Sequence, residues 1–324
     1  MAQTQPSAGT VAELGEFPLI ERITAGLPSS PAVALGPGDD AAVFLVNGSA
    51  VTSVDMFVEG VHFRRDWSEP FDVGRKSVAG AVADLEAMGA VGVAMLVGLA
   101  LPGEVPQLWV DQFAAGVRAE ADRAGIALVG GDLSSASQIV VSVTVVGQSD
   151  GVAPVTRAGA KPGQVVAVCG RLGWAGAGLT ALARGFRSPK AVVDTHRCPK
   201  VPYGQGRVAA LAGAGAMIDV SDGLLADLGH IATASNVTIA LESKNFEAAE
   251  PVRAVAAATG RDPLDFVLTG GEDHALAATF DLGDVPEGWA VVGQVLAPPE
   301  DETAPAVLVD GIVWASSAPG WTHF

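Results

Sequence analysis

Carboxylates that follow glycines recur along the chain, and their spacing points to metal chemistry. Gly36-Pro-Gly-Asp-Asp40 opens a predicted strand, and Gly130-Gly-Asp132 comes at the end of another. Adjacent residues of a strand point to opposite faces, so Asp39 and Asp40 do not both lie on one solvent surface. We therefore expect at least one of them to face a cleft. The alternative is an Asx turn that merely opens the strand.

Two more acids of the first half occupy positions typical of ligands. Asp55 follows a run of apolar and hydroxyl residues, where a strand delivers side chains to a site at its end. Lys76, Gly80 and Asp84 are four residues apart and share one face of a predicted helix, and Gly80 allows a ligand or backbone to come close. Asp84 could be a surface charge, but its apolar neighbours favour a functional role.

The second half carries the segment Ile218-Asp-Val-Ser-Asp-Gly223. It predicts Asp219 and Ser221 on one side of a strand end, with Asp222 as the cap of the next helix. A helix N-terminus binds anions, and the two acids would repel an anion unless a cation lay between. An ordinary N-cap would explain Asp222 but not Asp219. The run Gly270-Gly-Glu-Asp-His274 repeats the pattern of glycines followed by acids.

So many converging carboxylates need compensation, since otherwise several would stay protonated at neutral pH. Hard divalent cations supply it. Oxygen ligands without a Cys or His cluster indicate Mg²⁺ bridging polyphosphate oxygens, with Ca²⁺ or Mn²⁺ as alternatives. The sequence has neither the P-loop pattern nor the motifs of protein kinases, which disfavours the common nucleotide-binding folds.

Composition limits the class of protein. The 324 residues favour two domains, and the net charge of -17 argues against nucleic acid as a partner. The longest apolar run, 87–101, is shorter than the roughly 20 residues of a membrane span and is typical of a buried strand. Residues 1–10 lack the features of a signal peptide, and two cysteines without metal-ligand spacing fit a reducing compartment. We expect a cytoplasmic protein without membrane association.

Periodicity predicts alternating helices and strands, and the turn-rich segment 157–163 marks a boundary between two domains, 1–152 and 153–324. The fold class is α/β (α+β), with mixed sheets covered by helices on one face. Asp72 is the expected N-cap of the first helix. The expected helices cover 73–88, 105–123, 174–184, 204–212 and 224–234. The expected strands cover 41–45, 50–54, 93–101, 126–129, 139–146, 164–168, 217–220, 237–241, 274–280 and 290–295.

Taken in order, these segments resemble the thiamine-monophosphate kinase family of the aminoimidazole ribonucleotide synthetase-like superfamily. The resemblance extends from Gly15 to Phe324. It rests on Gly-Asp-Asp, Asp-x-x-Val-Glu-Gly-Val-His-Phe, Asp-Leu-x-Ala-Met-Gly-Ala, Gly-Gly-Asp, Thr-Arg-x-Gly-Ala-Lys-Pro-Gly, Asp-x-Ser-Asp-Gly-Leu and Gly-Gly-Glu-Asp. Two positions depart from it: Val54 stands where some relatives have Thr, and His274 where Tyr is common.

The resemblance implies a homodimer in which the N-terminal sheets of two subunits pair, with ATP in the cleft and a C-terminal α/β domain completing the active site. It implies ATP-dependent phosphorylation of thiamine monophosphate to thiamine diphosphate, assisted by several Mg²⁺ ions. The implied metal ligands are Asp40, Ser53, Asp55, Asp84, Asp132, Asp219 and Asp222. The implied ATP contacts are Gly131, Asp132, Arg157 and Ser221, and those to the thiamine moiety are His62, Glu272 and Trp321. The expected catalytic residues are Asp84, Asp222 and Arg157.

Other readings stay open at this point. Another ATP-dependent enzyme of the superfamily, such as aminoimidazole ribonucleotide synthetase, would keep the ATP and magnesium sites with a different acceptor. Selenophosphate synthetase normally needs a reactive Cys or selenocysteine near its N-terminus, whereas the first cysteine here is Cys169. A non-catalytic acidic metal-binding protein is an alternative from a different class, but it would have no need of Arg157 or of an anion-ready helix start at Ser221.

Overall fold

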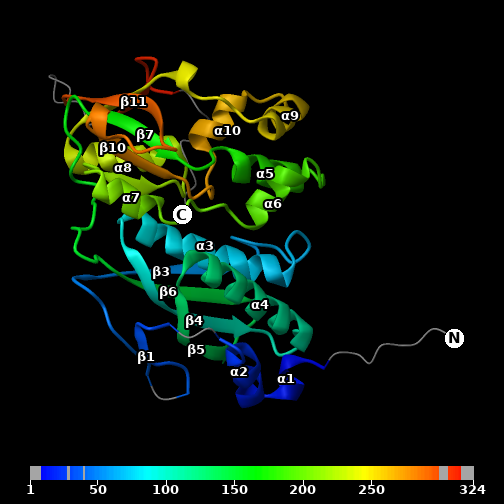
Figure 1. The fold of residues 1–324 in the computed structure, drawn as a ribbon. Helices are drawn as coiled ribbons and strands as arrows, with labels where there is room; N and C mark the ends of the chain where they lie inside the picture. The colour runs from blue at the N-terminus through cyan, green and yellow to red at the C-terminus, as the bar shows by residue number, and fades with distance from the viewer. Residues whose placement is uncertain (1–8, 28–29, 39–40, 299–305, 315–324) are drawn as a thin grey trace. The chain divides into compact units, whose positions relative to one another are not determined.

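The computed structural model describes residues 9–27, 30–38, 41–298 and 306–314. These form two compact units, each built on its own sheet (Figure 1). The first unit takes the described residues within Met1–Val46, Thr52–Ala81 and Gly92–Gly147. The second takes Asn47–Val51, Val82–Val91 and the described residues from Gln148 onward. The mixed α/β class expected from the sequence is confirmed.

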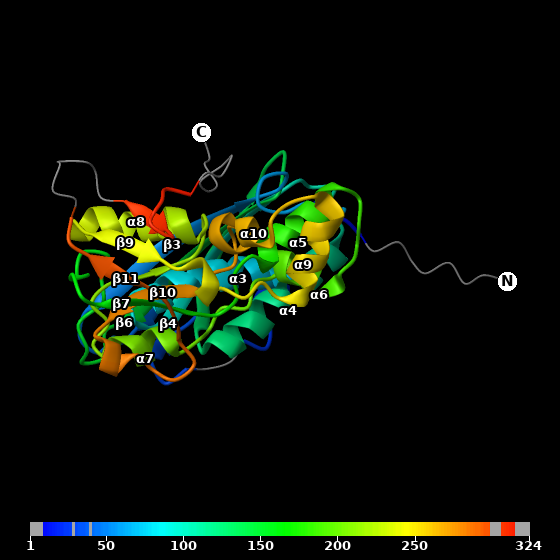
Figure 2. The same ribbon diagram turned by 90° about the horizontal axis from the view of Figure 1, so that it is seen from above.

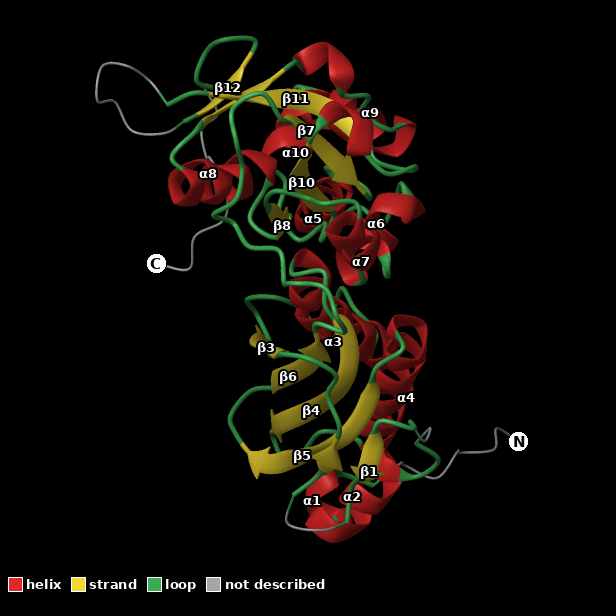
Figure 3. Ribbon diagram, turned by 60° about the vertical axis from the view of Figure 1, so that its left-hand side comes forward, coloured by secondary structure: helices red, strands yellow, loops and turns green. Residues whose placement is uncertain are grey.

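The sheet of the first unit has the strand order β3-β6-β4-β5, with β4 and β5 parallel. Strand β6 alternates strictly: Val141, Val143 and Val145 are fully buried while their neighbours are partly exposed. Helices α3 and α4 lie on the same side of this sheet (Figure 3). The strands are β3 (Ala50–Val58), β4 (Val91–Leu101), β5 (Ala127–Ser135) and β6 (Val140–Gln148), and the helices α3 (Pro70–Ala87) and α4 (Gln107–Ala124).

The remaining elements of the first unit precede β3. They are helices α1 (Val11–Leu14) and α2 (Glu16–Thr24) and the antiparallel pair β1 (Val33–Leu35) and β2 (Val43–Phe44). Thr10 and Glu13 form a capping box at the start of α1, because each side chain bonds to the other residue's backbone N–H.

The second unit has the strand order β12-β9-β11-β7-β10-β8. All of its neighbouring strands pair antiparallel except β12 with β9. The strands are β7 (Val165–Cys169), β8 (Met217–Asp219), β9 (Thr238–Leu241), β10 (Leu276–Phe280), β11 (Ala290–Leu296) and β12 (Val307–Val309). The helices are α5 (Trp174–Ala183), α6 (Lys190–Arg197), α7 (Gln205–Leu211), α8 (Leu224–Ser235), α9 (Glu250–Thr259) and α10 (Pro263–Thr269), with short 3₁₀ turns at Ser243–Asn245 and Leu282–Asp284.

This second sheet is covered on both faces, which corrects the expectation of one covered face. Neighbouring residues of β7 enter different cores: Val166 packs with Leu228 of α8, whereas Ala167 packs with Ala209 of α7. Successive strand residues point to opposite faces, so the two helices cover opposite sides. Figure 2 shows α8 and α7 on either side of the strands. Apolar residues therefore cover both faces of this sheet, which explains why β7 and β10 are almost entirely buried.

Three expectations for elements near candidate residues need correction. Helix α3 begins at Pro70, so Asp72 lies inside its first turn and is not its N-cap; proline suits the first helical position because its φ is already helical. Strand β5 does not end before Gly130 but continues to Ser135, since it pairs with β4 along that length. Helices α6, α9 and α10 were not expected; they are short, with 8, 10 and 7 residues.

The apolar run 87–101 consists of the last residue of α3, a short turn and the strand β4. The expectation that this run forms a strand is therefore confirmed for Val91–Leu101. Among the residues that the structure describes, none of the helices is long and apolar enough to cross a membrane.

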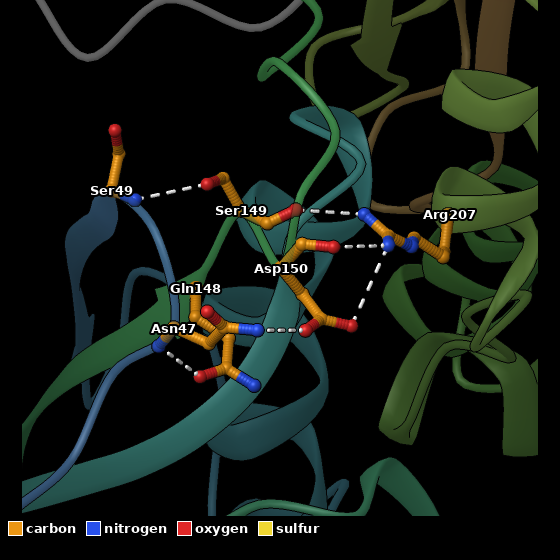
Figure 4. A network of polar contacts seen from close by, with 6 residues as sticks. All are labelled: Asn47, Ser49, Gln148, Ser149, Asp150 and Arg207. Atoms are coloured by element: carbon orange, nitrogen blue, oxygen red, sulfur yellow. Dashed lines mark hydrogen bonds and ion pairs between the residues drawn. The ribbon is translucent and has the colours of Figure 1, made fainter.

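A polar network joins residues 47–49 and 148–150 to Arg207 of α7, and all of these residues belong to the second unit (Figure 4). The Arg207 guanidinium donates to the carbonyl oxygens of Ser149 and Asp150, both at 2.7 Å. The Asn47 amide donates to the Asp150 carboxylate at 2.7 Å, and the Ser149 hydroxyl accepts from the Ser49 N–H at 2.9 Å. A charged donor fixes two backbone carbonyls here, so the chain is held firmly where it leaves β6.

Two glycines of the second unit should respond oppositely to alanine. A Cβ at Gly206 would lie 1.9 Å from the Glu86 carbonyl oxygen, whereas one at Gly229 in α8 would meet nothing within 4 Å. We expect Gly206→Ala to lower the free energy of unfolding by about 1–3 kcal/mol. Gly229→Ala should raise it by about 0.5–1 kcal/mol, because alanine restricts the unfolded chain and favours helix. Urea unfolding measures both, and equal effects of the two variants would contradict the packing described.

Candidate active site

The segment between β8 and α8 gathers acids around a helix start. Strand β8 ends at Asp219, which is 5% exposed. Gly223 is the N-cap of α8, so Asp222 is not the cap that the sequence predicted. The reason is steric: Gly223 has φ +126°, and a Cβ there would lie 2.8 Å from the Thr269 carbonyl oxygen. The orphan N–H groups of Asp222 and Gly223 donate instead to one oxygen of Asp227, at 3.1 and 3.0 Å.

Asp227 experiences the combined charge of this segment. Burial raises the pKa of Asp227 to about 7, and the negative charges of Asp219 and Asp222 raise it further. Asp222, Asp227 and His230 each offer a ligand atom, and these atoms lie within 4.8 Å of one another. Carboxylates that repel one another suit a hard divalent cation, so Asp222 and Asp227 fit Mg²⁺, while His230 adds a nitrogen donor to the group.

The loop 270–274 lies against the same segment. The N–H groups of Glu272 and His274 donate to the carbonyl oxygens of Ser221 and Val220, at 2.7 and 2.8 Å. His274 Nδ1 lies 2.9 Å from a carboxylate oxygen of Asp219. The segment with the predicted residues Asp219, Ser221 and Asp222 is therefore in direct contact with the loop that carries Glu272.

The side chains on this loop have unlike surroundings. Glu272 is partly exposed, and its Oε2 lies 3.3 Å from Nδ1 of the buried His196 on α6. Asp273 is 1% exposed, and burial raises its pKa to about 7 despite the N–H bonds that it accepts.

Asp84 and Arg157 also belong to the second unit. Asp84 is half-buried near the end of α3. Two residues later, the buried Glu86 accepts from the N–H groups of Gly204 and Gly206, at 2.7 and 2.9 Å, and so fixes this turn of α3 against α7. Arg157 is exposed, and its carbonyl oxygen accepts from the Ser235 hydroxyl at 2.7 Å.

The first unit holds the other predicted residues within the described ranges. Ser53 and Asp55 are half-buried on the same face of β3, two residues apart. His62 follows β3: its Nδ1 accepts from the Val58 N–H at 3.0 Å, and its carbonyl oxygen accepts from the buried Lys76 ammonium at 2.9 Å. These bonds fix the loop that presents His62.

Asp132 projects from β5 beside an open cavity of about 200 Å³. Gly131 permits this, because a Cβ there would lie 2.1 Å from the Val97 carbonyl oxygen of β4. The Ser134 hydroxyl donates to Asp132 at 3.1 Å. The cavity is lined by the small or polar residues Gly98, Ala100, Asp132, Ser134 and Ser142, together with Leu99 and Val140.

The predicted residues therefore divide between the two units. Ser53, Asp55, His62, Gly131 and Asp132 lie in the first, and Asp84, Arg157, Asp219, Ser221, Asp222 and Glu272 in the second. Asp40 and Trp321 lie outside the described residues. Sequence reasoning did not select Asp227 or His196. An acid on the otherwise apolar face of 224–235 was the available signal for Asp227, whereas the sequence offered none for His196.

Comparison with known proteins gives a consistent result. Residues 38–149 match the family model "AIR synthase related protein, N-terminal domain". A thiamine-monophosphate kinase of Mycobacterium tuberculosis is 49% identical over 97% of this chain and 93% of its own. The structure of thiamine-monophosphate kinase from Stenotrophomonas maltophilia matches with a TM-score of 0.79 at 32% identity, covering 92% of this chain and 98% of that one. A structure described as AaThiL complexed with AMPPCP and TMP matches with a TM-score of 0.76 at 27% identity over the whole of both chains.

The two raised pKa values predict how stability depends on pH in magnesium-free protein. Asp227 and Asp273 each have a folded-state pKa of about 7 against an ordinary value of 3.8, so the folded chain holds more protons than the unfolded one between these pH values. Their contribution to stability is complete below about pH 4 and is lost as pH rises through about 7. We expect Asp227→Asn to flatten the dependence of the unfolding temperature on pH between 4 and 7. A slope as steep as that of the wild type would contradict this assignment.

Proposed function

The chain belongs to the thiamine-monophosphate kinase family, and from this premise we propose direct, in-line transfer of the ATP γ-phosphate to thiamine monophosphate, assisted by several Mg²⁺ ions. Close homology assigns the phosphorylation of thiamine monophosphate to thiamine diphosphate at the expense of ATP. The observation that carries the metal proposal is the crowding of Asp219, Asp222 and Asp227 at the start of α8.

The proposed metal ligands are oxygen donors. Bound Mg²⁺ would offset the negative charge that spreads over the phosphates during transfer. The support is the raised pKa of Asp227, because a cation would stabilise the charged carboxylate that burial, and then the charges of Asp219 and Asp222, disfavour. The set comprises Asp40, Ser53, Asp55, Asp84, Asp132, Asp219 and Asp222.

We assign the contacts to ATP and to the acceptor on the same basis. Gly131, Asp132 and Ser221 would hold ATP, and the bare backbone at Gly131 together with the start of α8 suits phosphate oxygens. His62, Glu272 and Trp321 would contact the thiamine moiety. The His62 loop and Glu272 are both fixed by hydrogen bonds to their surroundings, as a binding residue requires.

The chemistry proposed here needs no protein nucleophile. A phosphate oxygen of thiamine monophosphate attacks the γ-phosphorus of ATP, the new P–O bond forms as the bond to the β-phosphate oxygen breaks, and ADP leaves. The Arg157 guanidinium, exposed on the second unit, would stabilise the equatorial oxygens in the transition state. Asp84 and Asp222 would act by holding the metal ions. Most of the acceleration would come from positioning the two substrates for reaction.

We also propose a cytoplasmic homodimer with residues 1–152 as the ATP, magnesium and dimerisation domain and 153–324 as the domain that completes the site. The support for pairing of the first unit is its edge strand. Strand β3 is at one end of the sheet order, and its Val54 and Met56 are more than half exposed. An apolar edge strand is favourable for association with a second sheet.

The deciding experiment follows ADP release from ATP and Mg²⁺ with thiamine monophosphate as acceptor. Thiamine and an aminoimidazole ribonucleotide precursor serve as control acceptors. We expect turnover with the monophosphate alone. Turnover with the aminoimidazole precursor instead would move the chain to another activity of the superfamily, and ATP binding without turnover would leave the acceptor to be found.

Among the proposed ligands, Asp222→Asn and Asp84→Asn should each lower kcat by at least about 100-fold, because each removes a carboxylate that acts through the metal ions. Their far-ultraviolet circular dichroism should match the wild type. Asp111→Asn, which removes an acid paired with Arg22 on the surface, is the matched control and should retain full activity. Normal kcat and a normal magnesium requirement in either site variant would refute its role.

A further inference from the structure

The backbone of the loop 270–274 adopts a conformation that its side chains disfavour. Glu272 has φ +63° and His274 has φ +50°, both in the left-handed region that residues with a Cβ avoid. The loop also passes close to its neighbours, since a Cβ at Gly270 would lie 2.4 Å from the Phe266 carbonyl oxygen and one at Gly271 2.7 Å from that of Ser221. Two strained residues within three positions need an interaction that holds them in place.

Asp273 supplies that interaction. It stands between the two strained residues and is 1% exposed. One of its carboxylate oxygens accepts from the Ala175 N–H at 2.7 Å, and the other accepts from the Gly173 N–H. These are N–H groups at the start of α5, where a carboxylate also interacts favourably with the helix dipole. Both carboxylate oxygens are thus bonded to a rigid element.

The residues on either side of Asp273 reach partners on different elements. Glu272 points to His196 on α6, with 3.3 Å between Oε2 and Nδ1. His274 points to Asp219 at the end of β8, with 2.9 Å between Nδ1 and Oδ2. In an extended strand, the side chains of Glu272 and His274 would point to the same face. Their positive φ values let them reach α6 and the end of β8 instead.

We propose that Asp273 is a positioning residue: by bonding to the start of α5 it holds the strained loop 270–274 so that Glu272 is oriented by His196 and Asp219 is oriented by His274. The roles of Glu272 toward the thiamine moiety and of Asp219 toward magnesium rest on the proposed function. The positioning itself does not. The partner side chains are buried or half-buried, so small displacements of the loop change their distances directly.

The first variant is Asp273→Asn, which keeps the shape of the side chain but places an NH₂ group against one of the two N–H donors. We expect the KM for thiamine monophosphate and the Mg²⁺ concentration at half-maximal rate each to rise by about tenfold or more. The KM for ATP should rise clearly less, because no residue of the loop is a proposed ATP contact and the loop meets Ser221 only at its backbone carbonyl. Asp273→Glu keeps both acceptor oxygens and displaces the loop by one methylene. If Asp273→Asn does not fold, Asp273→Glu should show the same rise in the KM for thiamine monophosphate and in the Mg²⁺ requirement, with a smaller change in the KM for ATP.

The control for lost stability is Glu120→Gln. Glu120 is 1% exposed and bonds to Arg75 at 2.7 Å in the first unit, so this variant also breaks a buried carboxylate interaction. It should lower the unfolding temperature with both KM values and the Mg²⁺ requirement unchanged. If Asp273→Asn behaved in the same way, Asp273 would be a structural residue and the proposal would be wrong.

A double variant tests whether Asp273 acts through Glu272. Glu272→Gln alone should raise the KM for thiamine monophosphate, and adding Asp273→Asn should raise it by clearly less than the product of the two single effects. Multiplicative effects would show independent action and overturn the proposal.

Histidine NMR separates this inference from the proposed function, because it needs no turnover. In Asp273→Asn, the ring resonances of His196 and His274 should shift, while those of His62 in the first unit should not. Unshifted resonances would overturn the positioning role even in an active enzyme. Shifted resonances in a wild-type protein that shows no thiamine monophosphate kinase activity would leave the positioning intact and refute the function.

Discussion

Repulsion between carboxylates at the end of β8 is the constraint on which the organisation of the second unit depends. Burial raises the pKa of Asp227, and the nearby charges of Asp219 and Asp222 raise it further. Part of the compensation comes from the N–H groups at the start of α8. The remaining charge is the support for the proposal that a cation binds at this place.

The same local solution occurs at three helix starts of the second unit. Each has a glycine N-cap with positive φ and no side-chain cap, and in each the N–H of that glycine donates to a buried carboxylate from another part of the chain or from a later turn. The pairs are Gly173 with Asp273, Gly204 with Glu86, and Gly223 with Asp227. A buried acid is tolerated at a helix start because two N–H donors and the helix dipole stabilise its charge. The acids thereby join elements that are distant in sequence.

This arrangement gives the glycines of the chain a specific task. Gly131, Gly206 and Gly223 each lie so close to a neighbouring carbonyl oxygen that a Cβ would overlap with it. At Gly206 and Gly223 this close approach lets the backbone N–H groups donate to the buried carboxylates of Glu86 and Asp227. The glycines at these places are thus a consequence of backbone packing.

The sequence by itself determined the mixed α/β class, most strands and long helices, and the family, because periodicity and local motifs are properties of neighbouring residues. It also pointed to Asp219, Ser221, Asp222 and Glu272, and the structure joins Glu272 to Ser221 by a backbone hydrogen bond. Tertiary structure decided what depends on distant partners. Gly223 and not Asp222 caps α8 because Thr269 leaves no room for a Cβ, and β5 continues past Gly131 because β4 pairs with it. The pairing of His196 with Glu272, 76 positions apart, has no local signal, since only the packing of α6 against the loop creates it.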